Sequence, residues 1–277
     1  MPYHVRSILV PVHDAAMLQA ALPRARRLAE RLGATVEVLH VHAVPLGRLP
    51  TGDGVPASTL RRRMAAAEQT EDRRMEEVRA LVEAATADDP AGAAVRWRVV
   101  EGAEDVALAH HGRLADLIVL SRPPGHGAAP DGALLNAALM ETGRPVLLLP
   151  PAGDDLMPAR IAVAWDGSLQ AARALSEAMP LLAAAQAVTV LRIADSADDR
   201  LAQEAAQHLA RHGVAVTART LRVTGSVADT LRGAVIEAGA DLLVMGAYGH
   251  GRLRERVLGG VTRSLLTAAP VPVLLAH

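Results

Sequence analysis

The sequence predicts an α/β protein made of two tandem, doubly wound domains with parallel sheets. Short apolar runs alternate with segments of helical periodicity, which is the pattern of consecutive βαβ units. The same order of elements returns after about half of the 277 residues. A repeat of this length indicates duplicated domains, because the repeats of solenoid proteins are roughly 20–50 residues long.

The first three elements each carry their own signal. Residues 8–12 form a short apolar run that predicts a strand. Residues 16–32 place apolar side chains at helical spacing, and Gly33 follows as a stop signal. Residues 35–41 return to a strand-like pattern. The order strand, helix, strand favours a parallel βαβ unit.

The second half repeats this order with a strand, a helix and a strand over residues 161–165, 168–184 and 187–193. Two later segments also match in sequence between the halves: residues 115–120 with 240–245, and 144–148 with 271–275. Each half therefore reads β-α-β-α-β-α-β-α-β. The strands are nearly continuous apolar runs, which is typical of a sheet that helices cover on both faces.

A short segment rich in proline and glycine, residues 150–155, separates the two halves. We expect a first domain over residues 1–150 and a second over 156–277. The first half also has an insertion, residues 43–58, which leads into a charged helix over 59–85. Charges of alternating sign along that helix indicate a solvated face.

The composition excludes several kinds of chemistry. The chain has no Cys, so thiolate metal sites and Cys nucleophiles are ruled out. It also has no Lys, which rules out Schiff-base and kinase-type lysines. The net charge of -1 and the two Trp, two Tyr and no Phe argue against a nucleic-acid or membrane partner. No signal peptide and no transmembrane span is predicted, so the expected location is the cytoplasm.

Ligands of doubly wound sheets bind beyond the carboxyl ends of the strands, where the strand order reverses. In the second half, Asp166-Gly167-Ser168 follows the first strand. The fourth strand runs into Gly246-Ala247-Tyr248-Gly249, and nine residues later come Gly259 and Gly260. Glycines let backbone amides approach phosphate oxygens, and a helix N-terminus favours an anion. These features indicate a nucleotide phosphate site.

This Gly-x-x-Gly-(nine residues)-Gly pattern resembles that of the universal stress proteins that bind ATP, and with the duplicated topology the resemblance covers essentially the whole chain. It implies a 3-2-1-4-5 strand order in each half, and ATP, with Mg²⁺ accompanying it, as the ligand of the second half. It also implies a ribose contact by Asp166. The binding residues implied are Asp166, Ile193, Gly246, Gly249, Gly259, Gly260, Val261 and Thr262.

Gly260 departs from the family pattern, which has Ser or Thr there. The loss of that hydroxyl predicts weak ATP binding, although Thr262 lies two residues on. The first half departs further, because His13 replaces the acid and Ser121 replaces the leading glycine. Prolines in the same loop supply no amide donor. We expect the first half to be structural, with a different ligand as the alternative.

Two readings of the remaining residues stay open. His40 and His42 could share a metal with His13 or Asp14, but a strand end with partly exposed histidines explains them more simply. No nucleophile elbow, His-Glu-x-x-His or dinucleotide fingerprint occurs, so no catalytic residue is assigned. The prediction is a non-enzymatic stress-response protein. The alternatives are an interaction module that binds no nucleotide, and a slow ATPase or phosphoryl transferase.

The fifth strand of each half is expected to be a sheet edge with unpaired backbone groups. Residues 146–149 and 273–276 are both short and apolar. We therefore predict that these two strands pair with each other within one chain. The result would be an intrachain pseudo-dimer, and further dimerisation stays open.

Overall fold

We describe the protein from a computed structural model. The structure describes residues 4–42, 57–88, 92–123, 132–151, 153, 158–195, 198–248 and 260–277. In this part of the chain the strands are β1 (Ser7–Val12), β2 (Thr35–His42), β3 (Val95–Glu101), β4 (Leu117–Ser121), β5 (Val146–Leu149), β6 (Arg160–Ala164), β7 (Ala187–Ile193), β8 (Val216–Leu221), β9 (Leu242–Gly246) and β10 (Val273–Ala276). The helices are α1 (Ala15–Leu32), α2 (Ala57–Asp88), α3 (Glu104–Gly112), α4 (Gly132–Glu141), α5 (Leu169–Glu177), α6 (Met179–Ala184), α7 (Arg200–Arg211), α8 (Val227–Glu237) and α9 (Gly260–Ala268).

The described strands form one sheet of ten strands in the order β3-β2-β1-β4-β5-β10-β9-β6-β7-β8. If the strands of each half are numbered one to five along the chain, both halves have the order 5-4-1-2-3 from the centre of the sheet outwards. The expected doubly wound topology is therefore confirmed in both halves. Within each half the neighbouring strands are parallel. The switch points between strands one and four lie at β1/β4 and at β6/β9.

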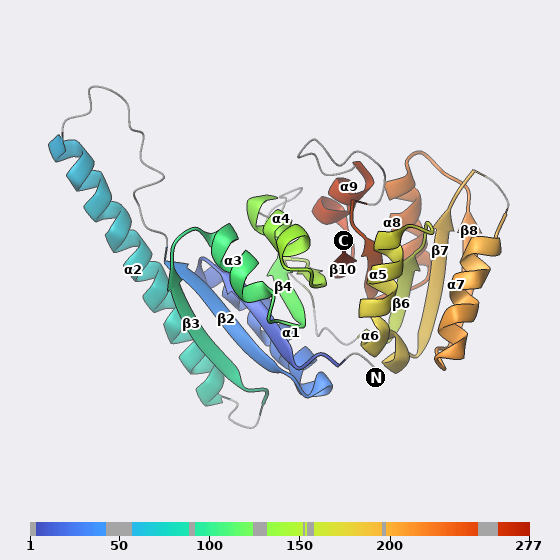
Figure 1. The fold of residues 1–277 in the computed structure, drawn as a ribbon, viewed down its shortest axis with the longest axis horizontal. Coiled ribbons are helices and arrows are strands. Elements are labelled where there is room, and N and C mark those ends of the chain that lie inside the picture. The colour runs from blue at the N-terminus through green and yellow to red at the C-terminus, as the bar shows by residue number, and fades with distance from the viewer. Residues whose placement is uncertain are drawn as a thin grey trace.

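The two halves join edge to edge through β5 and β10, as the sequence predicts. These strands are antiparallel, and Leu147 lies opposite Leu274. Both strands are buried along their whole length. Pairing removes the two edges whose backbone groups would otherwise be unsatisfied. Figure 1 shows the result, with the first half on one side of this seam and the second half on the other.

Helices cover both faces of the sheet, as the apolar strands require. One core contains buried side chains of α1, α2, α5, α6 and α7, and the other contains those of α3, α4, α8 and α9. Each core includes residues from both halves of the chain. No helix in the described ranges is long and apolar enough to cross a membrane.

The charged helix α2 is 32 residues long. Only Val78 and Val82 are buried among its described side chains, which agrees with the predicted solvated face. Its N-terminal part projects beyond the sheet in Figure 1. The predicted insertion lies almost entirely outside the described residues.

One predicted helix is wrong in its extent. Residues 168–184 form two helices, α5 and α6, because Pro180 has no N–H to continue the hydrogen-bond ladder. Pro180 instead lies in the first turn of α6, where a missing donor costs nothing.

Candidate functional site

Three of the predicted site residues end neighbouring strands at one edge of the second-half sheet. Asp166 follows β6, Ile193 ends β7, and Gly246 ends β9. β6 pairs with both β7 and β9. The carboxyl ends of these parallel strands therefore bring the three residues to the same edge, at the point where the strand order reverses.

Asp166 makes the turn that leads into α5. Its Oδ1 accepts a hydrogen bond of 2.9 Å from the amide of Ser168. Gly167 between them has φ +78, a left-handed conformation that favours glycine. The helix itself is capped by Ser168, whose hydroxyl accepts from the amide of Ala171 at 3.1 Å. Asp166 is thus held by local backbone geometry and not used as the cap.

Gly246 is required by packing, a role that the sequence did not indicate. A Cβ built at Gly246 would lie 2.5 Å from the backbone nitrogen of Ala171 and 2.6 Å from the carbonyl carbon of Gln170. No rotation of a side chain relieves such a contact, since both atoms belong to the backbone of α5. The glycine therefore lets α5 lie directly on the end of β9. This packing role is compatible with the predicted approach of a phosphate to the backbone of Gly246.

Tyr248 is a feature of the site that sequence reasoning missed. It is the single described non-glycine residue with positive φ, at 62°. Its ring meets that of His277 edge to face, with centroids 5.8 Å apart, and burial raises the pKa of its hydroxyl. His277 Nδ1 also lies 3.0 Å from the carbonyl oxygen of Ala247. Left-handed backbone at a bulky residue is strained, and such strain is common at binding sites.

The helix α9 begins at Gly260, the predicted phosphate-binding position. The backbone amides and the dipole at the N-terminus of a helix make such an end suited to an anion. Thr262 lies in the first turn and is 6% exposed, so its side chain packs into the protein. Val261 also lies in this turn. Gly249 and Gly259 fall outside the described residues.

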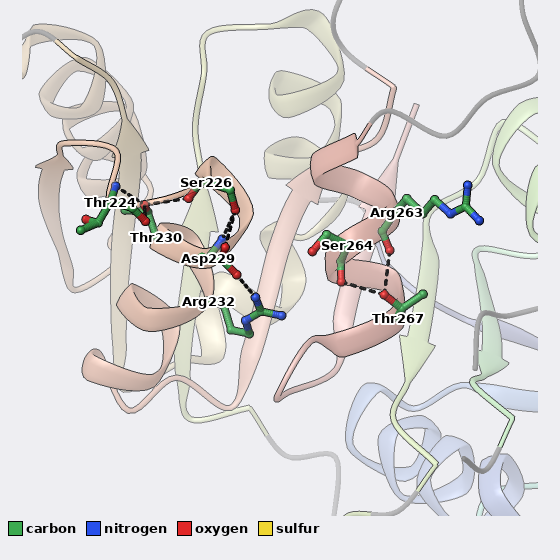
Figure 2. A network of polar contacts seen from close by, with 8 residues as sticks. All are labelled: Thr224, Ser226, Asp229, Thr230, Arg232, Arg263, Ser264 and Thr267. Carbon is green, nitrogen blue, oxygen red and sulfur yellow. Dashed lines mark hydrogen bonds and ion pairs between the residues drawn. The ribbon is translucent and has the colours of Figure 1, made fainter. Parts of the chain in front are cut away.

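A network of polar side chains lies at the start of α8, a helix that packs beside α9 (Figure 2). Ser226 caps α8 by accepting from the amide of Asp229 at 3.1 Å, and it also bonds to the Asp229 carboxylate at 2.7 Å. This second bond, together with Arg232, lowers the pKa of Asp229. Thr230 ties the preceding loop by donating to the carbonyl of Thr224. The Ser-x-x-Asp spacing is a capping signal that sequence reasoning could have used.

The first half differs at the equivalent positions. Ile8 pairs with Leu117 in the first half as Ile161 pairs with Leu242 in the second. His13 lies five residues after Ile8, and Asp166 lies five residues after Ile161. His13 is therefore the first-half equivalent of Asp166. His13 Nε2 lies 3.1 Å from Asp14 Oδ2. Asp14 caps α1 by accepting from the amide of Met17 at 2.8 Å. The position of the second-half acid is therefore a histidine in the first half, and the neighbouring Asp14 caps α1.

The structure does not support the metal alternative. In the described part of the chain, no three His, Asp or Glu side chains are grouped so that they could hold a metal ion. His40 is fully buried and stacks on Trp97 with ring centroids 5.7 Å apart. Burial lowers the pKa of His40, so the neutral imidazole is favoured. His40 is best explained as a core residue.

Comparison with known families assigns both halves. The model of the universal stress protein family matches residues 4–150 and again 157–277. The chain belongs to the universal stress protein family. A comparison with curated protein sequences found no significant match.

Solved structures agree with this family fold over the full length. A universal stress protein from Archaeoglobus fulgidus DSM 4304 is 18% identical with a TM-score of 0.64, covering 100% of this chain and 97% of its own. A functionally unknown protein from Pseudomonas aeruginosa PAO1 is also 18% identical with a TM-score of 0.63, covering 98% and 92%. At this identity the likeness establishes the fold.

Proposed function

We propose that this universal stress protein binds one adenine nucleotide, ATP, in its second half and acts in a stress response without catalysing a reaction. The nucleotide lies across the carboxyl ends of β6, β7 and β9, with its phosphates toward the N-terminus of α9. Mg²⁺ accompanies the phosphates. The cytoplasm remains the expected location.

One observation carries this proposal: Asp166, Ile193 and Gly246 converge on one sheet edge, and α9, the next described element after β9, begins with Gly260. The carboxylate of Asp166 is suited to ribose hydroxyls, and Ile193 offers an apolar, half-buried surface. The amides at the start of α9 are suited to phosphate. The first half lacks this set, because His13 and Ser121 take the equivalent places.

Two other functions compete with this one. An interaction module of the same family would bind no nucleotide, and the missing hydroxyl at Gly260 favours it. A slow ATPase or phosphoryl transferase would need a base near the phosphates. No base is evident in the sequence, and the chain has no Lys of the kind that holds the phosphates in ATPases and kinases, so both points argue against that third function.

Calorimetric titration of the full chain with Mg-ATP tests the proposal. We expect a stoichiometry of one per chain, and a loss of affinity of about tenfold or more in Asp166→Ala, because a hydrogen bond to a charged group contributes roughly 1.5–3 kcal/mol. Asp72→Ala removes an exposed acid of α2 and serves as the matched control. Two equivalent sites, or an Asp166→Ala variant that binds as the parent does, would refute it.

Gly260 gives an independent test of the phosphate position. Gly260→Ser restores the hydroxyl that the family pattern carries and should tighten ATP binding roughly 10- to 100-fold. Gly233→Ser, in an open position of α8, is the control. If neither the parent nor Gly260→Ser binds ATP, the interaction module becomes the better account.

A further inference from the structure

The N-terminal part of α2, residues 57–70, extends past the end of the sheet (Figure 1). Glu71 follows it and lies within electrostatic range of His40, near the end of β2. The core residues of α2 come later still: Val78, Leu81, Val82 and Ala85. None of the described side chains in 58–70 is buried. About 20 Å of helix, at 1.5 Å per residue, therefore lies beyond the cores.

An apolar stripe continues along this projecting part of α2. Leu60, Met64 and Ala67 follow one another at spacings of four and three residues, which places them on one side of the helix. The same spacing leads on to Val78, so the stripe lies on the side that packs against the sheet further along. The three side chains are partly exposed, and in the described structure they pack against neither core. A helical segment gains most of its stability by packing its apolar face, so this stripe is suited to a partner.

The charges of α2 differ between its two parts. In the C-terminal part, ion pairs join side chains three or four residues apart: 71 with 74, 73 with 77, and 79 with both 76 and 83. Arg61, Arg62, Arg63 and Glu68 of the projecting part form no ion pair with any described residue. Arg61 and Glu68 lie about two helical turns apart, so they flank the apolar stripe on the same side.

A second copy of the chain matches this pattern when its α2 runs antiparallel to the first. Met64 of one copy then packs on Ala67 of the other, and two-fold symmetry repeats the contact. In the same register Arg61 of each copy faces Glu68 of the other, as charges beside the apolar stripe do in paired helices. A parallel partner is blocked by the fold. It would run along the stripe into the sheet on which α2 packs at Val78.

We propose that the projecting part of α2 is a dimerisation surface, on which two copies of the chain pair as antiparallel helices through Leu60, Met64 and Ala67. Arg61 and Glu68 fix the register by forming two ion pairs between the copies. The two sheets lie at opposite ends of the paired helices, and the second half of each chain takes no part in the contact. The surface is short, so the dimer is reversible, as is usual for small interfaces.

This surface does not depend on nucleotide binding by the second half. Sedimentation velocity of the full chain tests it at concentrations from about 1 μM to about 1 mM, the range of weak association. The chain has a mass of 29.0 kDa, and the sedimenting species should approach twice that mass as the concentration rises.

Charge reversal tests the register. Arg61→Glu and Glu68→Arg should each weaken the dimer about fivefold or more, because each dimer loses two exposed ion pairs and gains two like-charge contacts. The double variant Arg61→Glu/Glu68→Arg restores opposite charges and should bind within about threefold of the parent. Arg62→Glu, on the far side of the helix from the stripe, is the matched control and should change the affinity less than about twofold.

A charge within the stripe tests the apolar contact. Met64→Glu should weaken the dimer about tenfold or more, because it buries a carboxylate between the two helices. Ala66→Glu, at an exposed position away from the stripe, is the control and should leave the dimer intact. Circular dichroism checks that each variant keeps its helices. If Met64→Glu does not fold, the charge-reversal series decides.

Three results would overturn the proposal. The first is a chain that stays monomeric over the whole concentration range, which would leave this face to a different partner. The second is a dimer that survives Met64→Glu in a folded variant, which would place the association elsewhere on the molecule. The third is a double charge reversal that binds as weakly as the single variants.

Discussion

At the scale of single residues, Gly246 shows how a residue assigned to a ligand can be required by packing. Its missing Cβ lets α5 approach the end of β9 at backbone contact distance. Gly246→Ala should therefore lower the free energy of unfolding by about 1–3 kcal/mol, the usual cost of overpacking. Urea denaturation measures this change.

Gly233 provides the matched control for that experiment. It lies inside α8, and a Cβ there would meet no atom within 4 Å. Gly233→Ala should leave stability unchanged or raise it by about 0.5–1 kcal/mol, because alanine is the better helix former. Equal effects of the two substitutions would contradict the packing role of Gly246.

Glu177 predicts a pH dependence of stability. Burial raises the pKa of its carboxyl from 4.5 to about 7, against the opposing influence of Arg173 and Arg144. The folded state therefore holds a proton that the unfolded state has lost between these values. It follows that the contribution of Glu177 to the free energy of unfolding falls as the pH rises from about 4.5 to about 7, and then stays level.

Glu177→Gln should remove this dependence. At pH 8 the variant should be more stable than the parent by less than about 3 kcal/mol, because the side chain is only partly buried. At pH 4.5 the two should be alike. Urea denaturation across this range checks both expectations, with Glu68→Gln on exposed α2 as control. If the stability of the parent relative to Glu177→Gln rises with pH over the same interval, the sign is wrong.

At the scale of elements, the two prolines at helical positions act differently. Pro180 ends α5, yet α1 continues through Pro23. In that turn the Arg24 side chain donates to the carbonyl oxygen of Ala20, at 2.9 Å from Nε and 2.6 Å from Nη2. Nη2 also donates to the carbonyl of Pro150 at 2.8 Å, which ties α1 to the linker. A buried side chain thus satisfies carbonyls of both segments.

Arg24→Met should lower the free energy of unfolding by about 1–3 kcal/mol, since it removes the side-chain donor to the half-buried carbonyl of Pro150 while keeping the apolar stem. Chemical denaturation gives the value. Arg31→Met, at the exposed end of the same helix, should cost no more than about 1 kcal/mol. A loss at Arg24 that does not exceed the loss at Arg31 would count against the tether.

At the scale of the whole molecule, the two halves share one sheet and both cores. The seam between β5 and β10 is buried, and each core contains side chains of both halves. We therefore expect one cooperative transition in calorimetry. Leu28→Ala in α1 and Leu209→Ala in α7 should each cost about 2–5 kcal/mol and shift that same transition. Two separate transitions, each moved by only one of the variants, would show that the halves unfold independently.

Much of this architecture is contained in the sequence. The apolar runs and helical periods of residues 8–41 and 161–193 predict the βαβ units, because each pattern follows from which face of a strand or helix is buried. The duplication predicts two sheets, and the short apolar strands β5 and β10 predict their pairing, because an apolar edge needs a partner. The positions of Asp166 and Gly260 at strand and helix ends follow from the same local signals.

Other features depend on contacts between segments far apart in the chain, and only the tertiary structure decides them. The sequence shows that Ser121 replaces a glycine, but only the structure shows that its side chain is buried at the end of β4. Gly246 must be a glycine because the backbone of α5 packs against it. The buried side chains of Arg24 and Arg122 donate to carbonyl groups 126 and 147 residues away in the chain. Local pattern fixes which elements form, whereas distances between packed elements are set by the side chains that meet across them.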